Sequence, residues 1–215
     1  MPTSHPHQIS TIVNAIVMLD PKSVLDIGVG FGKYGVLCRE YLELWDGRED
    51  YHHFIRRIDG IEAFEDYLTP LHRYIYNHVY IGDAQTVIKT LKHAYDLVLL
   101  IDVLEHISEP QGRALIKYIL AHHGGILIST PKQMDEQGAS FHNTFETHVK
   151  QWTVSTLRAL GPSVIFPDAE SHLVYIGARG SIQQLKARQR WERIKYFGRK
   201  IPYAKHLYRR FRRPA

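Results

Sequence analysis

The sequence has very little cysteine, since Cys38 is the only one among 215 residues. A lone cysteine cannot form a disulfide within the chain, so the framework that stabilises small secreted domains is excluded. No run approaches about 18 consecutive apolar residues, and no segment is therefore predicted to span a membrane. The first residues, Met1 to Gln8, have no basic stretch and no small-residue cleavage site, which argues against a secretory signal. We therefore expect a cytoplasmic protein.

Charge is distributed unevenly along the chain. Apolar residues make up 44% of the sequence and charged residues 23%, a composition typical of a globular domain with a substantial core. Residues 179–215 contain 13 lysines and arginines and one acidic residue, Glu192, whereas residues 1–178 have a net negative charge. We therefore divide the chain into a domain of residues 1–178 and a basic tail of residues 179–215. Such a tail is expected to contact an anionic surface or partner.

Short apolar runs alternate with segments of helical periodicity along the domain. We expect strands at residues 23–27, 57–62, 79–81, 96–102, 126–129, 164–166 and 172–178. We expect helices at residues 8–19, 33–44, 67–78, 87–91, 111–122 and 153–160. The alternation is typical of right-handed βαβ units, and it predicts an α/β fold with a mostly parallel sheet covered on both faces. Only a short loop joins the last two strands, so they should pair antiparallel.

Residues able to hold a nucleoside stand at the ends of four predicted strands. In chain order they are Asp26, Gly28, Gly30 and Gly32; Glu62; Asp83 and Ala84; and Asp102. Because ligands of open α/β sheets bind beyond the carboxyl ends of the strands, these residues predict one shared site. The glycines let the backbone approach a ligand closely. A carboxylate suits a ribose diol, and a carboxylate beside a backbone amide can recognise the edge of an adenine.

Five sequence segments carry a resemblance to a known family. They are VLDIGVGFG at 24–32, GIE at 60–62, GDA at 82–84, YDLV at 95–98 and DVLEH at 102–106. Over residues 8–178 the chain resembles the class I S-adenosylmethionine-dependent methyltransferases. The resemblance implies a Rossmann-like methyltransferase fold, with a seven-stranded, mostly parallel sheet whose last strand is antiparallel and with helices on both faces. It also implies that S-adenosyl-L-methionine is the cofactor and S-adenosyl-L-homocysteine the product.

The resemblance assigns roles to individual residues. It implies that Asp26, Gly28, Gly30 and Gly32 hold the methionine end of the cofactor and that Glu62 binds the ribose hydroxyls. It places Asp83 and Ala84 at the adenine edge, and Asp102 and Val103 on the floor of the site. The chain departs from the family pattern in the wide gap between Gly32 and Glu62, which we interpret as an insertion at residues 45–53.

A dinucleotide site is the competing interpretation of the glycine-rich segment. The spacing Gly30-x-Gly32-x-x-Gly35 also matches the dinucleotide fingerprint. In that fingerprint an acidic residue follows about 20 residues later, whereas Glu62 lies 32 residues after Gly30. Asp26 and Gly28 also precede the triplet, so the methyltransferase interpretation is favoured.

Two histidines are candidates for assisting the methyl acceptor. The sequence Asp102-x-x-Glu105-His106, with the distant His148, is similar to the Glu-x-x-Glu-His and later His of some metal-assisted methyltransferases, which act on small-RNA termini or on quinones. The first position of the motif is Asp in this chain, where those enzymes have Glu. In metal-free relatives the residues that correspond to Glu105 and His106 begin a loop or a helical turn. We predict that His106 and His148 are catalytic and act as a base or as metal ligands at an oxygen acceptor. A divalent metal is compatible with this motif, but we do not predict one.

The predicted function is methylation of an oxygen of a small molecule, a glycan or a lipid-linked intermediate. One alternative is an RNA methyltransferase, which the basic tail and the partial likeness to the metal-assisted motif support. The other is a methyltransferase-like binding subunit without chemistry, which the intact strand-end acids disfavour. In the tail, Tyr203, Leu207, Tyr208 and Phe211 have helical spacing among basic residues, which favours an amphipathic helix at an anionic inner membrane surface. Nucleic acid is less favoured because no RNA-binding module precedes the tail.

Overall fold

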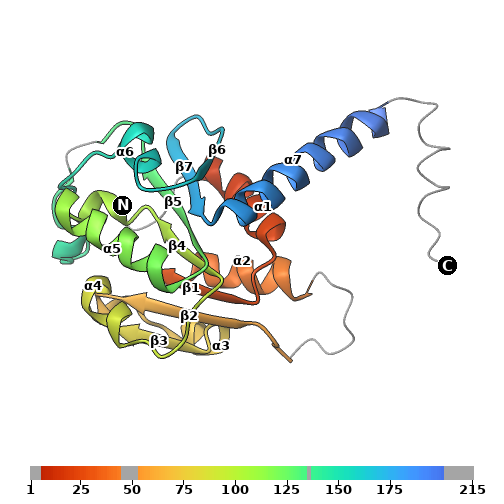
Figure 1. The fold of residues 1–215 in the computed structure, drawn as a ribbon. Helices are drawn as coiled ribbons and strands as arrows, with labels where there is room; N and C mark the ends of the chain where they lie inside the picture. Colours follow the sequence, from red (N-terminus) through yellow and green to blue (C-terminus); the bar gives the residue numbers. More distant parts are fainter. Residues whose placement is uncertain (1–5, 45–52, 135–136, 201–215) are drawn as a thin grey trace.

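A seven-stranded sheet with the order β3-β2-β1-β4-β5-β7-β6 forms the centre of the structure. The computed structural model describes residues 6–44, 53–134 and 137–200 (Figure 1). The strands are β1 (Ser23–Ile27), β2 (Arg57–Glu62), β3 (His78–Ile81), β4 (Leu97–Ile101), β5 (Gly125–Pro131), β6 (Ser163–Phe166) and β7 (Ser171–Gly177). Six strands of this sheet run in one direction, and β7 runs in the other, antiparallel to both β5 and β6. The predicted sheet and its antiparallel last strand are therefore confirmed.

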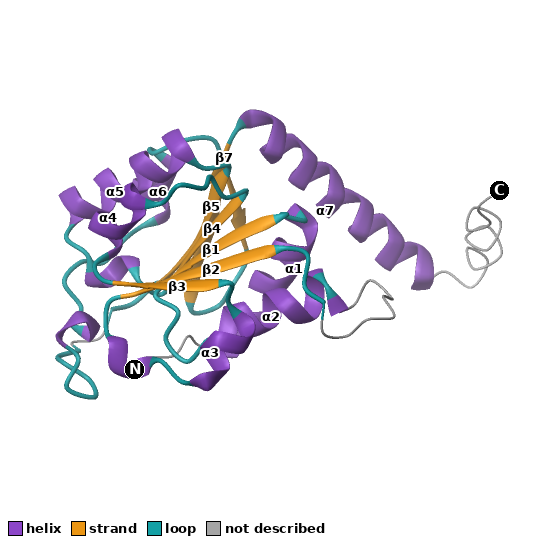
Figure 2. Ribbon diagram, turned by 90° about the horizontal axis from the view of Figure 1, so that it is seen from below, coloured by secondary structure: helices purple, strands orange, loops and turns teal. Residues whose placement is uncertain are grey.

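Helices cover both faces of the sheet (Figure 2). The α-helices are α1 (Ile9–Leu19), α2 (Lys33–Leu42), α3 (Pro70–Ile75), α4 (Ala84–Val87), α5 (Glu109–His122), α6 (Val154–Arg158) and α7 (Arg179–Lys200). Single 3-10 turns are η1 (Pro6–Gln8), η3 (Glu65–Tyr67), η4 (Ile88–Thr90), η5 (Leu104–His106) and η6 (Thr144–Glu146). Helices α1, α2 and α3 lie on one side of the sheet, and α4, α5 and α6 lie on the other (Figure 2).

The two core layers follow from alternation along the buried strands. In β4 every residue is buried, as expected for a central parallel strand covered on both faces. Leu97 and Leu99 pack into the layer under α1 and α2, whereas Val98 and Leu100 pack into the layer under α5 and α6.

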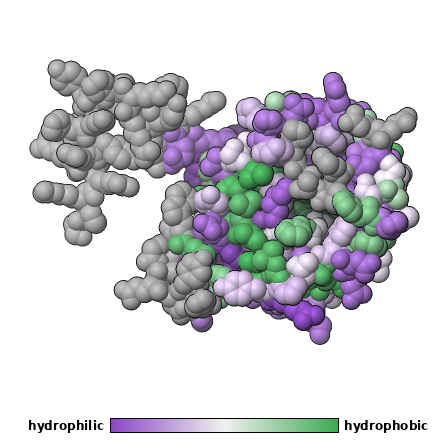
Figure 3. Space-filling model, turned by 180° about the vertical axis from the view of Figure 1, so that it is seen from behind, coloured by the Kyte–Doolittle hydropathy of each residue, from purple (hydrophilic) through white to green (hydrophobic). Residues whose placement is uncertain are grey.

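On the surface, hydrophobic side chains gather near the middle of the face seen in Figure 3, bordered by hydrophilic ones.

The predicted helix at 67–78 is wrong in extent. The structure has the single turn η3, then extended backbone at Leu68 and Thr69, and a helix only from Pro70 to Ile75. Proline disfavours helical backbone at the residue before it, and Thr69 accordingly has φ −129° and ψ 171°. Pro70 then occupies the first turn of α3, where its missing N–H costs nothing.

Helix α7 follows β7 almost directly and leaves the rest of the structure (Figure 1). Its first turns belong to the core, since Ile182 and Leu185 are buried with residues of α1 and β7. The aromatic residues predicted to form a helix at 203–211, and residues 45–52 of the proposed insertion, lie outside the described residues. Within the described ranges, none of the helices has both the length and the apolar character needed to cross a membrane.

Candidate active site

A cavity of about 320 Å³ lies at the carboxyl ends of β1, β2, β3 and β4. This is the edge where open α/β sheets bind ligands, and the volume is in the range of small-molecule sites. Most of the residues predicted to hold a cofactor line it, together with one predicted catalytic residue. These are Gly28, Gly30, Glu62, Asp83, Ala84, Asp102, Val103 and His106.

The glycine-rich loop after β1 requires glycine at its first position. Gly28 has φ +75°, and a Cβ there would come within 2.5 Å of Cγ2 of Val103. Both the backbone conformation and the lack of space exclude larger residues. Gly28 thereby brings the loop into contact with the segment that follows β4, and the two segments form adjoining parts of the cavity wall.

Glu62 joins the loop to the end of β2. Its Oε2 accepts a hydrogen bond from the backbone N–H of Gly30 at 2.9 Å, and its Oε1 accepts one from Phe64 at 2.9 Å. The side chain is only 5% exposed. Burial raises the pKa of Glu62, while the two backbone hydrogen bonds act in the opposite direction. The carboxylate is thus held in one orientation at the cavity wall, and each oxygen has a second lone pair for a ligand hydroxyl.

Asp83 and Asp102 are positioned by different devices. Asp83 is the N-cap of α4, and its Oδ1 accepts hydrogen bonds from the backbone N–H groups of Gln85 and Thr86. Asp102 has a left-handed backbone, with φ 53°, which aspartate tolerates better than most residues. Its carboxylate accepts hydrogen bonds from Nε2 of Gln8 and from Oγ of Ser129, each at 2.5 Å.

Asp26 and Gly32 are absent from the described residues that line the cavity. Asp26 is 2% exposed and points toward α3, where the hydroxyl of Tyr76 donates a hydrogen bond to its Oδ2 at 2.6 Å. Tyr76 in turn accepts a hydrogen bond from the backbone N–H of Gly35. Gly32 ends the loop as the N-cap of α2. Asp26 is thus linked through Tyr76 to the first turn of α2, and contact of Asp26 and Gly32 with the methionine end of a cofactor stays a prediction.

Asp26 is expected to make stability depend on pH. Burial is the main reason that the pKa of Asp26 is raised from 3.8 to about 7. The hydrogen bond from Tyr76 lowers this pKa, and the negative charge of Glu62 raises it further. Between these two values the folded protein holds a proton that the unfolded chain releases. Stability therefore falls as pH rises from about 4 to 7, by about 4 kcal/mol at most.

Asp26→Asn keeps a neutral group of the same shape and should reduce this fall. The measurement is urea-induced unfolding of both proteins at pH 5 and at pH 8. The loss of unfolding free energy between the two pH values should be smaller in the variant. An equal loss in both proteins would show that Asp26 does not titrate in this range.

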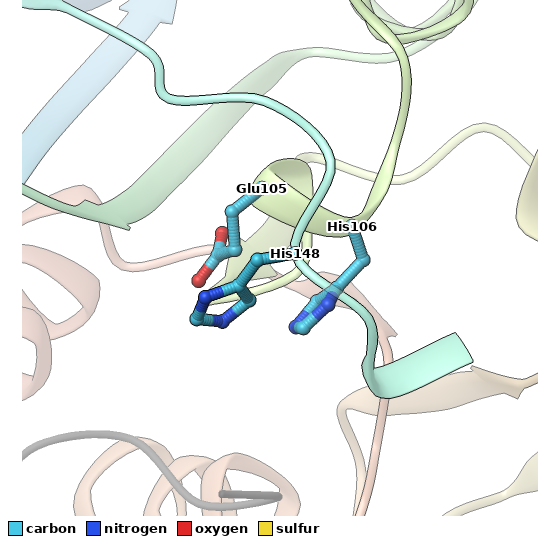
Figure 4. Close-up of side chains that lie close together, drawn as sticks. All are labelled: Glu105, His106 and His148. Carbon is cyan, nitrogen blue, oxygen red and sulfur yellow. The ribbon is translucent and has the colours of Figure 1, made fainter. Parts of the chain in front are cut away.

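His106 and His148 lie side by side although 41 residues separate them in the chain. Their ring centroids are 5.0 Å apart, and Glu105 lies beside them (Figure 4). Potential ligand atoms of Glu105, His106 and His148 all lie within 4.8 Å of one another. Among the described residues, Oε2 of Glu105 is buried without a hydrogen-bond partner. His106 lines the cavity, whereas His148 contacts His106 and is absent from the described residues that line the cavity.

The loop that carries His148 is attached to η5 by backbone hydrogen bonds. The N–H groups of Val149 and Lys150 both donate to the carbonyl of Glu105. The buried indole of Trp152 donates to the carbonyl of Leu104 at 2.9 Å, and Nδ1 of His106 lies 3.1 Å from the carbonyl oxygen of Thr147. Burial lowers the pKa of His106, which favours the neutral imidazole required of a base or a metal ligand.

Several cavity residues were not predicted from the sequence. They are Lys33, Tyr34, Tyr67, Gln111, Asn143, Phe145 and Glu146. Tyr67 and Glu146 are themselves joined by a hydrogen bond of 3.0 Å. The only sequence signal for Asn143, Phe145 and Glu146 was their position in a polar loop after a parallel strand, where ligand-binding residues are common. Gln8, which binds Asp102 from the N-terminal turn, carried no signal at all.

The strand order, with six strands in one direction and β7 antiparallel, matches the Rossmann-like methyltransferase fold. Solved structures agree. The chain is similar to an O-methyltransferase family protein from Burkholderia thailandensis, with 14% identity, a TM-score of 0.55 and coverage of 78% of this chain and 55% of that one. The methyltransferase domain of bacterial CtHen1 is 17% identical, with a TM-score of 0.54 and coverage of 80% and 98%.

A third similar structure is a SAM-dependent methyltransferase from Archaeoglobus fulgidus, with 16% identity, a TM-score of 0.54 and coverage of 79% and 94%. At these identities the likeness shows the fold, as the sequence predicted. The chain spans about half the length of the Burkholderia protein. No protein-family model and no curated protein matches the sequence.

Proposed function

We propose that the chain is an S-adenosylmethionine-dependent methyltransferase that acts on an oxygen of a small molecule, a glycan or a lipid-linked intermediate. The observation that carries the proposal is the cavity itself. It gathers the glycine-rich loop, Glu62, the Asp83–Ala84 pair and the Asp102–Val103 pair from four strand ends. In this proposal Glu62 accepts hydrogen bonds from the ribose hydroxyls, Asp83 and Ala84 meet the adenine edge, and the loop holds the methionine end.

The acceptor side of the cavity supports transfer to a hydroxyl. When bound, S-adenosylmethionine supplies a methyl group on a positively charged sulfur. The residues must place the acceptor oxygen in line with that methyl group and take up the acceptor's proton. His106 lies in the wall and His148 lies against it, so the pair can receive the proton. Phe31 and Phe145 also line the cavity and are 73% and 52% exposed, which supports an acceptor with an apolar part.

Binding a divalent cation is the second candidate role of the cluster formed by Glu105, His106 and His148. Two imidazoles and a carboxylate are a common donor set for such ions, and the partnerless Oε2 of Glu105 fits a cation. Glu105, His106 and His148 would then hold the ion. A bound cation lowers the pKa of a hydroxyl that binds to it. The described residues thus fit either arrangement, with the histidines as bases or as ligands.

RNA is the competing acceptor class, and a binding subunit without chemistry is the competing kind of protein. The basic tail of residues 179–215 favours an RNA acceptor. The aromatic cavity wall, formed by Phe31 and Phe145, speaks for a smaller acceptor. The histidine pair at the cavity speaks against a protein that only binds.

Isothermal titration of the full chain with S-adenosylmethionine tests the proposal. We expect one binding site with micromolar affinity and S-adenosylhomocysteine competing for it. NAD is the control ligand, because the glycine spacing also fits a dinucleotide. Heat of binding with NAD and none with S-adenosylmethionine would overturn the proposal.

A further inference from the structure

The outer part of α7, residues 186–194, extends beyond the body of the structure (Figure 1). Contacts of the preceding turns fix which side of the helix faces the domain. Ile182 and Leu185 are buried in the core layer shared with α1. Arg188 donates a hydrogen bond to the carbonyl oxygen of Met18 in α1. The opposite side of the helix therefore faces away from the domain.

That opposite side combines cationic and apolar side chains. With 3.6 residues per turn, positions 186, 190 and 194 lie in line along a helix, and positions 187 and 191 lie beside them. We call these five residues the outer face of α7, and all of them are exposed: Lys186, Ala187, Arg190, Trp191 and Ile194. Trp191 is 56% exposed and Ile194 52%. The acidic residue Glu192 lies on the other side of the helix, so negative charge is absent from the outer face.

We propose that the outer face of α7 binds the surface of an anionic membrane. A helix that lies at a membrane surface places basic residues among the headgroups and aromatic or aliphatic residues at the boundary with the acyl chains. Each Lys or Arg near an anionic leaflet strengthens binding. Lys186 and Arg190 supply the charges, while Trp191 and Ile194 supply the apolar contact. This inference goes beyond the proposed methyl transfer and is independent of it.

A nucleic acid fits the outer face less well. Phosphates are recognised by cations, which would leave Ile194 and most of Trp191 in water. Stacking of bases on an aromatic residue normally takes place in a positively charged groove. The outer face of α7 is the convex side of a helix. The pairing of an aliphatic with an aromatic residue therefore favours lipid.

The membrane contact and the cavity lie at opposite edges of the sheet. Because β7 is antiparallel, its last residue, Gly177, pairs with Gly125 at the start of β5. Helix α7 thus begins at the edge where the parallel strands start, whereas the cavity lies where β1, β2, β3 and β4 end. The outer face of α7 acts as a tether for the protein, and changes to it should leave the cofactor site intact.

Cosedimentation of the full chain with vesicles tests the proposal. The vesicles contain phosphatidylcholine with phosphatidylglycerol, or phosphatidylcholine alone. One variant combines Lys186→Glu with Arg190→Glu, and another combines Trp191→Ser with Ile194→Ser. The control combines Lys89→Glu with Lys92→Glu, which makes the same change of charge at exposed positions elsewhere. All changed side chains are exposed, and circular dichroism checks that each variant is folded.

We expect the natural chain to bind the anionic vesicles and not the neutral ones. Each α7 variant should lose at least about tenfold in its partition coefficient, while the control keeps most of the binding. Equal binding by the natural chain and both α7 variants would overturn the proposal, as would equal loss in the control. Binding of a short RNA that depends on Lys186 and Arg190, with vesicle binding unaffected by the Trp191 and Ile194 changes, would assign the face to nucleic acid instead.

Discussion

Replacing Glu62 by alanine should raise the dissociation constant of S-adenosylmethionine by about 100-fold. The carboxylate is the acidic group at the end of β2, and backbone hydrogen bonds from Gly30 and Phe64 hold it at the cavity wall. A hydrogen bond to a charged group contributes about 1.5–3 kcal/mol, and about 1.4 kcal/mol corresponds to a factor of ten in affinity. Two such bonds to a ribose diol, each at the lower bound and together about 3 kcal/mol, account for the expected loss.

Two further variants separate ligand binding from loop structure. Glu65→Ala removes an exposed acidic residue three positions later and should leave the affinity unchanged. Glu62→Gln keeps the length of the side chain but presents an N–H₂ group where an acceptor is needed, so it should also weaken binding by at least about tenfold. Titration calorimetry measures all three dissociation constants. Unchanged affinity in both Glu62 variants would remove this residue from the cofactor site.

Replacing His106 or His148 by alanine should lower kcat by about 100-fold or more once an acceptor is identified. General acid–base catalysis commonly contributes a factor of about 100 to 10,000. The two rings are 5.0 Å apart, and the loop carrying His148 is attached to η5. The dissociation constant of S-adenosylmethionine should stay the same in both variants, because neither ring belongs to the proposed cofactor contacts. A radiolabelled-methyl assay measures turnover.

His122→Ala is the matched control, since His122 is exposed at the far end of α5 and should not affect turnover. Metal dependence distinguishes the two roles of the cluster. If Glu105, His106 and His148 hold a cation, a chelator abolishes turnover and added Mn²⁺ or Mg²⁺ restores it in the natural chain. If the histidines act as bases, the chelator has no effect. Full turnover in both histidine variants would reject either role.

Elements with a strong apolar pattern were predictable from the sequence. The buried strand Leu97–Ile101 and the glycine-rich segment after Ile27 can each be recognised from a few neighbouring residues. The order of strand-end residues then predicts one site, because parallel strands end at the same edge of a sheet. The structure gathers most of those residues around a single cavity.

What could not be predicted depends on side-chain direction and on contacts distant in sequence. Asp26 is next to the glycine loop in the chain, yet its side chain is absent from the described cavity lining and accepts a hydrogen bond from Tyr76. The sequence around residues 67–69 predicts a helix, but Pro70 imposes an extended backbone on the residue before it, so α3 begins only at Pro70. His106 and His148 were predicted as a pair from the resemblance alone, whereas the contact that joins them, a long loop bound back onto the carbonyl of Glu105, had no signal in the sequence.

The hydrogen bonds of Gln8 have a consequence for how the protein folds during synthesis. Gln8 is fully buried and bonds with both Asp102 and Ser129, which lie 94 and 121 residues later in the chain. A ribosome makes the N-terminal turn first, so this side chain lacks one of these two native partners until β5 has been synthesised. Contacts of such sequence separation slow folding, because the intervening chain must be closed before they form. The floor of the cavity is therefore completed late, and the newly made N-terminal turn waits for more than half of the chain before it reaches its final position.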